Sequence, residues 1–74
     1  MLFGKRLRIE REKRELSAQS LAEIAGVSRS YITLIENGKR LPSRKVIHKM
    51  TLALKVKTNV IVNWYLEDLR EKLL

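Results

Sequence analysis

The stretch from Ser17 to Gly38 constrains the fold of this chain most, because its pattern predicts two short helices joined by a tight turn. Its apolar residues line one inner seam if residues 18–25 and 29–37 are both helical. These residues are Leu21, Ala25, Val27, Ile32 and Ile35. Other elements must cover this seam, so we expect the rest of the chain to supply the remaining core.

The residues between the two predicted helices fit a tight turn. Gly26 can adopt the left-handed conformation that ends the first helix, and Ser28 can accept backbone N–H bonds at the start of the second. Ala22 suits the point where the helix axes approach most closely, since a longer side chain would push them apart. The outer side of the second helix is then free for binding.

Several short motifs around this turn occur together between residues 4 and 56. They are Leu16-Ser17, Leu21-Ala22, Gly26-Val27-Ser28, Ile32, Ile35-Glu36-Asn37-Gly38 and Leu41-Pro42-Ser43, with Arg11 upstream. Together they resemble the helix-turn-helix family of lambdoid phage repressors, Cro proteins and XRE-type regulators. Arg29-Ser30-Tyr31-Ile32 further resembles the recognition helix of restriction-modification controller proteins in that family. The resemblance implies an all-α, compact five-helix, lambda-repressor-like DNA-binding domain.

The charge of the chain is basic and uneven. Sixteen Lys and Arg against eight Asp and Glu give a net charge of +8. Residues 1–45 hold eleven basic and five acidic groups, whereas residues 46–74 hold five and three. We expect a polyanion to meet the first half, because counterion release from a phosphate backbone rewards a basic face. Solubility alone is the other explanation that this composition leaves open.

Length and composition limit what else the chain can be. A chain of 74 residues supports one domain, and the core of so small a domain supplies only about 3 to 5 kcal/mol. With no cysteine and one histidine, we expect no disulfide, metal or cofactor, so a second copy is the predicted additional support. The sequence has no secretory signal and no apolar run of ~20 residues, which predicts a soluble, cytoplasmic protein.

The first predicted helix covers residues 4–14 and turns Phe3, Leu7 and Arg11 inward, with Leu16 closing the same side. The resemblance implies that Arg11 pairs with Glu36 at the end of the recognition helix. A planar guanidinium suits this role because it can hold a carboxylate with two hydrogen bonds. The alternative is that Glu36 contacts only Lys39 or Arg40 in solvent.

The start of the second helix departs from the family pattern. Ser17 is the predicted N-cap, although Ser20 three residues later leaves the capping box incomplete. Family members commonly open this helix with a glutamine that holds a phosphate, whereas this chain has Ala18 there and Gln19 one place later. Gln19 therefore has two interpretations, a displaced phosphate contact or a solvated helix residue.

The outer face of the predicted recognition helix supplies the candidate contacts to DNA bases. Arg29 can fork to guanine O6 and N7, with a phosphate contact as its alternative. Leu34 can touch a thymine methyl group, with a contact between protein subunits as its alternative. The candidate base contacts are Arg29, Ser30, Thr33, Leu34 and Ser28.

Residues beside this helix are the candidate contacts to the DNA backbone. The turn after the helix directs Lys39 and Arg40 toward phosphates, and Pro42-Ser43 starts a fourth helix whose free N–H groups favour an anion. Arg44 stands where the family usually has an apolar residue, which strengthens the phosphate interpretation. The candidate backbone contacts are Gln19, Tyr31, Asn37, Lys39, Arg40, Ser43 and Arg44.

The fourth helix is predicted to be a core element, with no role in binding a cofactor. Its inner face is predicted to comprise Ile47, Met50, Thr51 and Leu54, with Val46, Ala53 and Val56 beside them. His48 has no neighbouring Cys or His and is predicted to be solvated.

The fifth predicted helix starts after a Thr58 cap and carries two apolar stripes. Val60, Ile61 and Trp64 are predicted to pack on the domain formed by residues 1–57. The second stripe has coiled-coil spacing and is predicted to meet its twin across a two-fold axis, which makes residues 58–74 a dimerisation element. A helix that folds wholly onto its own domain, or docks to a downstream domain, is the alternative. The dimer stripe is Val62, Leu66, Leu69 and Leu73.

These features predict a homodimeric, sequence-specific regulator of transcription, as repressor or autoregulatory controller, that binds a near-palindromic operator in double-stranded DNA. Two-fold symmetry requires half-sites about one helical turn, ~34 Å, apart. The alternative is an antitoxin or accessory protein that binds mainly another protein. An enzyme is not expected, because the sequence has no glycine-rich phosphate loop and no nucleophile with a suitable neighbouring base.

Overall fold

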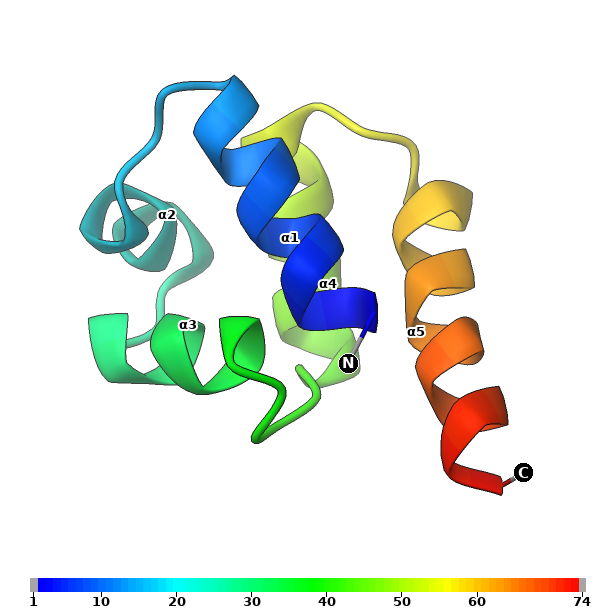
Figure 1. Cartoon of the computed structure of the whole chain (residues 1–74). Helices are drawn as coiled ribbons and strands as arrows, with labels where there is room; N and C mark the ends of the chain where they lie inside the picture. Colours follow the sequence, from blue (N-terminus) through cyan, green and yellow to red (C-terminus); the bar gives the residue numbers. More distant parts are fainter. Residues whose placement is uncertain (1, 74) are drawn as a thin grey trace.

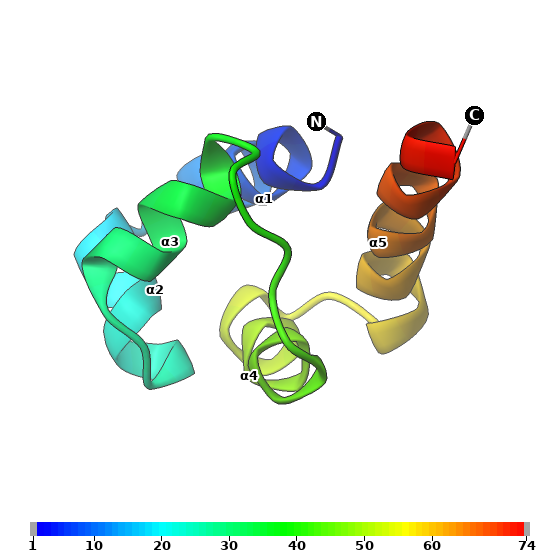
Figure 2. The ribbon, with the colours of Figure 1, turned by 90° about the horizontal axis from the view of Figure 1, so that it is seen from below.

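Five α-helices make up this computed structural model, which describes residues 2–73 of the 74-residue chain. α1 packs against α3 and α5, and α4 packs against α2 and α5. Figures 1 and 2 show α2 and α3 on one side of the molecule and α5 on the other, with α1 and α4 between them. The predicted all-α, five-helix architecture is confirmed. The helices are α1 (Leu2–Lys13), α2 (Ala18–Ala25), α3 (Arg29–Glu36), α4 (Arg44–Leu54) and α5 (Thr58–Leu73).

Serine residues start the three middle helices. Ser17, Ser28 and Ser43 have extended backbone angles, and each side-chain oxygen accepts the N–H of the residue three places later. Each serine thereby satisfies a backbone donor that has no partner within its own helix. The predicted caps at Ser17 and Ser28 are confirmed, and Ser43 starts the fourth helix as predicted, so the start of each of these helices is encoded locally.

Glycines end the two helices of the central motif. Gly26 has φ 69° and Gly38 has φ 75°, both in the left-handed region. After α2, Val27 N–H donates to the carbonyl of Ala22 at 3.0 Å, and after α3 Lys39 N–H donates to that of Leu34 at 2.9 Å. These bonds back across the helix end are typical of the Schellman motif. α3 therefore ends at Glu36, one residue before its predicted end, with Asn37 as its C-cap.

The core forms where the inner faces of all five helices meet. The predicted seam of α2 and α3 is buried, except that Val27 is half-buried and packs against it. Phe3 and Leu7 of α1 are fully buried over this seam. The core residues are Phe3, Leu7, Leu21, Ala22, Ile32, Ile35, Val46, Met50, Leu54, Ile61 and Trp64.

The inner face of α4 differs slightly from its prediction. Val46, Met50 and Leu54 form a buried row at four-residue steps, and Thr51 is buried beside it. Ile47, predicted to lie in the centre of this face, is half-buried at its edge. His48 is exposed, as predicted.

α5 corrects two further predictions. The helix includes Thr58 as its first residue, so Thr58 is not the cap that precedes it. Val60 is 37% exposed and does not belong to the packed face, which comprises Ile61, Trp64 and Asp68. These three residues share one side because helical neighbours recur three and four residues apart, and Val60 lies at the edge of that side.

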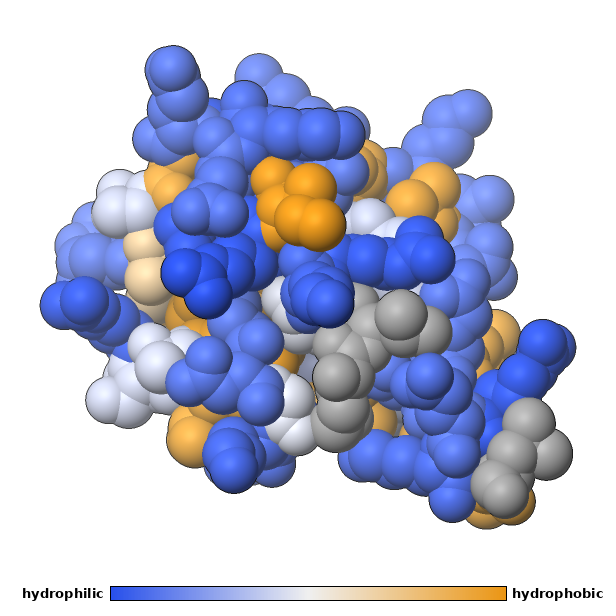
Figure 3. Space-filling model, viewed as in Figure 1, coloured by the Kyte–Doolittle hydropathy of each residue, from blue (hydrophilic) through white to orange (hydrophobic). Residues whose placement is uncertain are grey.

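The surface facing the viewer in Figure 3 is mostly hydrophilic, with a small apolar patch over α1. Within residues 2–73, no helix is both long enough and apolar enough to cross a membrane.

Candidate nucleic-acid interface

The outer face of α3 is open to solvent. Ile32 and Ile35 anchor the helix in the core, which turns its other side outward. Leu34, a large apolar side chain on this outer side, is 42% exposed. The five candidate base-contacting residues are all exposed, as the prediction requires; they are Ser28, Arg29, Ser30, Thr33 and Leu34.

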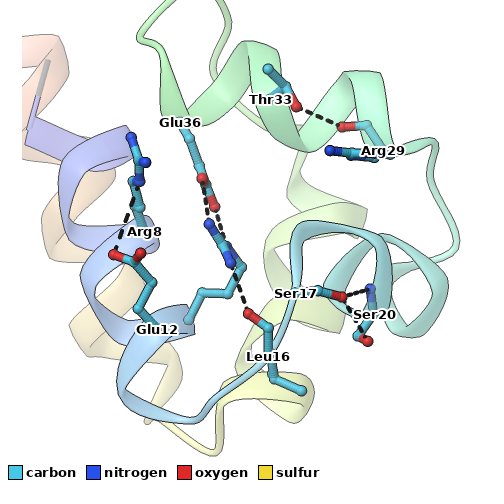
Figure 4. A network of polar contacts seen from close by, with 9 residues as sticks. Arg8, Glu12, Leu16, Ser17, Ser20, Arg29, Thr33 and Glu36 are labelled. Atoms are coloured by element: carbon cyan, nitrogen blue, oxygen red, sulfur yellow. Dashed lines mark hydrogen bonds and ion pairs between the residues drawn. The ribbon is translucent and has the colours of Figure 1, made fainter.

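Two hydroxyl groups on α3 have opposite hydrogen-bonding capacities. The Thr33 hydroxyl donates its proton to the carbonyl oxygen of Arg29 at 3.2 Å, so its oxygen is left to accept (Figure 4). The Tyr31 hydroxyl accepts the backbone N–H of Ser43 at 3.2 Å, so its proton is left to donate. The Thr33 hydroxyl is thus available as an acceptor, and the Tyr31 hydroxyl as a donor.

Tyr31 joins three parts of the interface. Its hydroxyl reaches the cap of α4 at Ser43, and the guanidinium carbon of Arg40 lies 4.9 Å from the centroid of its ring. This distance is within the range of a cation–π interaction. The ring therefore holds the recognition helix, the loop after it and the start of α4 together.

The start of α4 is also exposed. Ser43 caps the helix through Val46 N–H at 3.3 Å, and Arg44 and Lys45 follow in its first turn, both exposed. Backbone N–H groups at a helix N-terminus attract anions, and two cationic side chains add to that attraction. Asn37 and Lys39 are exposed in the loop that leads to this helix.

Gln19 lies apart from this cluster. It is exposed on α2 and its amide donates to Glu23 one turn further along the same helix, at 3.2 Å. This bond is the arrangement expected of a solvated helix residue. The structure gives Gln19 no contact with the other predicted backbone-binding residues.

The basic residues of this interface have no acidic partner. Throughout residues 2–73, ion pairs engage basic side chains of α1 and that of Arg14 just after it, and none engages the cations of α3, the following loop or the first turn of α4. The sole acidic residue between positions 29 and 45 is Glu36, which Arg11 holds. Between positions 29 and 45 the cations are Arg29, Lys39, Arg40, Arg44 and Lys45, and we call these five residues the basic face.

At the end of α3 the Glu36 side chain points toward α1 (Figure 4), where Arg11 pairs with it. The Arg11 Nε and Nη2 atoms donate to the two Glu36 carboxylate oxygens at 2.7 and 3.1 Å, and Nη1 donates to the Leu16 carbonyl at 2.7 Å. The hydrogen bonds to Glu36 raise the pKa of Arg11. The predicted pair is confirmed, and the guanidinium connects α1, the start of the helix-turn-helix and the end of α3.

The predicted dimer stripe lies on α5, remote from α3 (Figure 1). Val62 is 37% exposed, Leu66 53% and Leu73 87%, whereas Leu69 is half-buried. Three of the four residues of the stripe are thus exposed, and the fourth is half-buried.

Sequence reasoning missed two residues that support the interface. Gly4 is buried where α1 meets α3, and Asp68 is buried where α5 meets α1. A glycine inside a helical pattern is a signal of close packing, and it was available for Gly4. The sequence around Asp68 reads as an ordinary charged helix surface, so no signal distinguished this acid from its neighbours.

Comparison with known proteins gives a consistent result. A model of the helix-turn-helix domain family matches residues 2–61. The chain is 47% identical over 55 residues to the HTH-type transcriptional repressor RghR of Bacillus subtilis. That match covers 73% of this chain but 41% of RghR, so the chain spans about two fifths of that relative.

Two solved structures share the fold. The restriction-modification controller protein C.AhdI from Aeromonas hydrophila superposes with a TM-score of 0.75 and 37% identity, over 80% of this chain and 89% of that one. SinR, the master regulator for biofilm formation, was solved in complex with DNA and superposes with a TM-score of 0.75 and 31% identity, over 81% of this chain and 97% of that one. The predicted family resemblance and lambda-repressor-like fold are confirmed.

Proposed function

This chain belongs to the helix-turn-helix domain family, and on that premise we propose that it is a DNA-binding regulator of transcription, without enzymatic activity, that reads its site as a homodimer. The observation that carries the proposal is the exposed outer side of α3 next to the basic face, whose five cations have no ion pair within residues 2–73. An α-helix fits the major groove of B-DNA, and cations beside it would meet the phosphates on either side.

Each side chain has a proposed task within this arrangement. Arg29 forks to guanine, Thr33 accepts from an exocyclic amino group, and Leu34 contacts a thymine methyl group. Tyr31 donates its free proton to a phosphate, while Lys39 and Arg44 neutralise phosphates through charge. The two kinds of contact differ in effect: base contacts carry sequence information, whereas phosphate contacts fix the position of the protein.

The dimer stripe supports the homodimer. An exposed apolar strip with coiled-coil spacing is costly in water, and a two-fold axis through it buries the same surface on both copies. Two recognition helices would then enter successive major grooves, with half-sites ~34 Å apart. Repression follows most simply if the bound dimer blocks access of the polymerase, and RghR is itself named a repressor.

Selection of bound sites from random duplexes tests the proposal. We expect a near-palindromic sequence to be enriched, and Arg29→Ala to weaken binding to it by ~1 to 3 kcal/mol while binding to random DNA changes much less. Lys45→Ala is the matched control, because it should weaken both by similar factors. The absence of any enriched sequence would refute site-specific binding.

Sedimentation tests the dimer separately. Leu66→Asp should shift the protein toward the monomer, because a carboxylate in an apolar interface is not solvated. Leu52 is 67% exposed on α4 and lies outside the stripe, so Leu52→Asp should leave the mass unchanged. Equal masses for native protein and Leu66→Asp would remove the stripe as the interface between copies.

A further inference from the structure

The first turn of α1 is held by α5. The backbone N–H of Phe3 donates to the Asp68 carboxylate at 3.2 Å, and the Phe3 ring packs edge-on against Trp64 and Tyr65 at centroid distances of 6.0 and 6.2 Å. The first turn of α1 contains no acidic residue of its own. Asp68 therefore supplies from α5 the negative charge that a helix N-terminus favours.

The next residue, Gly4, is pressed against the end of α3. A Cβ atom at this position would overlap the carbonyl oxygen of Ile35 and would lie 2.7 Å from that of Glu36. Both obstacles are backbone atoms of the recognition helix, which cannot rotate away as a flexible side chain would. α1 can approach α3 this closely only because residue 4 has no side chain.

Consecutive residues therefore link two distant helices. Phe3 is hydrogen-bonded to α5, and Gly4 lies directly against the last turn of α3. Arg11 holds the side chain of Glu36 at the same end of α3. The candidate base contacts Arg29 and Thr33 belong to the same short rigid helix, so a displacement at its end is transmitted to them.

We propose that Phe3 and Gly4 couple the position of α5 to that of the recognition helix, and that Gly4 is a positioning residue for DNA sequence discrimination. The inference rests on the proposed function, in which α3 reads bases and α5 carries the dimer stripe. A side chain at residue 4 displaces the end of α3, so contacts that depend on exact geometry are lost. The charge-based contacts of the basic face tolerate such a displacement and are retained.

The test compares two equilibrium constants for each variant. One is measured on the duplex that the native protein enriches from a random pool, and the other on a duplex of random sequence. Gly4→Ala should reduce the ratio of the two affinities by roughly tenfold, while binding to random sequence stays within about twofold. Alanine ordinarily favours a helix over glycine, so this loss has the opposite sign to the effect of helix propensity.

Leu54→Ala is the matched control for lost stability. Leu54 is fully buried in α4, and its truncation leaves a cavity without pressing on α3. Its ratio of affinities should equal that of the native protein once both are measured below their unfolding temperatures. A folded Gly4→Ala variant with the native ratio would overturn the proposal.

Asp68→Ala tests the contact between α1 and α5, and it replaces Gly4→Ala as the test if that variant does not fold. It removes the acceptor of Phe3 N–H without touching α3, and we expect the ratio to fall by roughly threefold. An unchanged ratio in Asp68→Ala would overturn the coupling to α5.

Amide chemical shifts separate this inference from the proposed function. In Gly4→Ala, the amides of α3 should shift more than those of α2, and in Leu54→Ala they should not. If the native protein enriches no sequence, the proposed function fails, yet displaced α3 amides would still support the coupling. Unmoved α3 amides in Gly4→Ala would refute it.

Discussion

The basic residues of α1 and those of the basic face have different surroundings. On α1, Arg6 pairs with Glu67 at 3.2 Å, Arg8 with Glu12 at 3.9 Å, and Glu10 accepts from Arg14 at 2.5 Å and pairs with Lys13 at 3.6 Å. On the basic face, no cation has an ion pair among residues 2–73. Five of the six basic residues at positions 5–14 are thus paired within the fold, whereas those of the basic face have no ion pair and are available to a polyanion.

This contrast narrows the electrostatic prediction. The charge count assigns an excess of positive charge to residues 1–45 as a whole. Within residues 2–45, the structure leaves six cations without an ion pair, and five of these are the basic face; the sixth is Lys5 on α1. Each prediction below tests whether the two groups of cations really behave differently.

The largest effect is expected from Arg11→Ala. The substitution leaves Glu36, whose side chain is 8% exposed, without its partner, so the free energy of unfolding should fall by about 3 kcal/mol. Urea unfolding measures this change in the free energy of unfolding. Arg8→Ala is the control, because its pair with Glu12 is 59% exposed on both sides and should contribute less than about 1 kcal/mol. Similar losses in the two variants would contradict the structural role assigned to Arg11.

A second effect is expected in the salt dependence of DNA binding. Lys39→Ala combined with Arg40→Ala removes two proposed phosphate contacts, so the slope of log affinity against log salt should become shallower by about 2. Titration of a random duplex at several salt concentrations gives the slope. Arg8→Ala combined with Lys13→Ala removes the same amount of charge from α1. This control should change the slope of log affinity against log salt much less. Equal changes would mean that the location of the charge is irrelevant.

A smaller effect is expected from Tyr31→Phe. The variant keeps the ring beneath Arg40 but loses the hydroxyl that accepts from Ser43 and that we propose donates to a phosphate. Affinity for specific and random duplexes should fall alike, by about 1 kcal/mol, because the lost hydrogen bond carries no base information. A loss confined to the specific duplex would place the hydroxyl against a base edge instead.

The smallest effect concerns pH. The hydrogen bond from Arg14 lowers the pKa of Glu10 from its ordinary value of 4.5. A lowered pKa in the folded state means that this pair stabilises the fold above pH 4.5 and that the contribution disappears as pH falls through the folded pKa. Glu10→Gln should therefore lower the free energy of unfolding by less than about 1 kcal/mol at pH 7 and by less still at pH 3. If the difference in free energy of unfolding between the native protein and Glu10→Gln grew toward pH 3, the lowered pKa of Glu10 would be wrong.

The sequence by itself determined the local structure. Ser17, Ser28 and Ser43 start helices, and Gly26 and Gly38 end them, because each acts through its own backbone geometry and its near neighbours. The apolar spacing likewise identified the seam beneath the recognition helix, since helical periodicity decides which residues share a face. The family motifs added the pair between Arg11 and Glu36, which spacing alone left open.

Only the tertiary structure decided which faces meet and how closely. Asp68 reads as a surface acid yet lies buried at the start of α1, and Val60 reads as core yet is exposed at the edge of α5. Gly4 matters because the backbone of α3 happens to cross there. Periodicity assigns a residue to a side of its own helix, but the partner on that side is set by distances between segments far apart in the chain. Burial, ion pairing and close approach all depend on those distances.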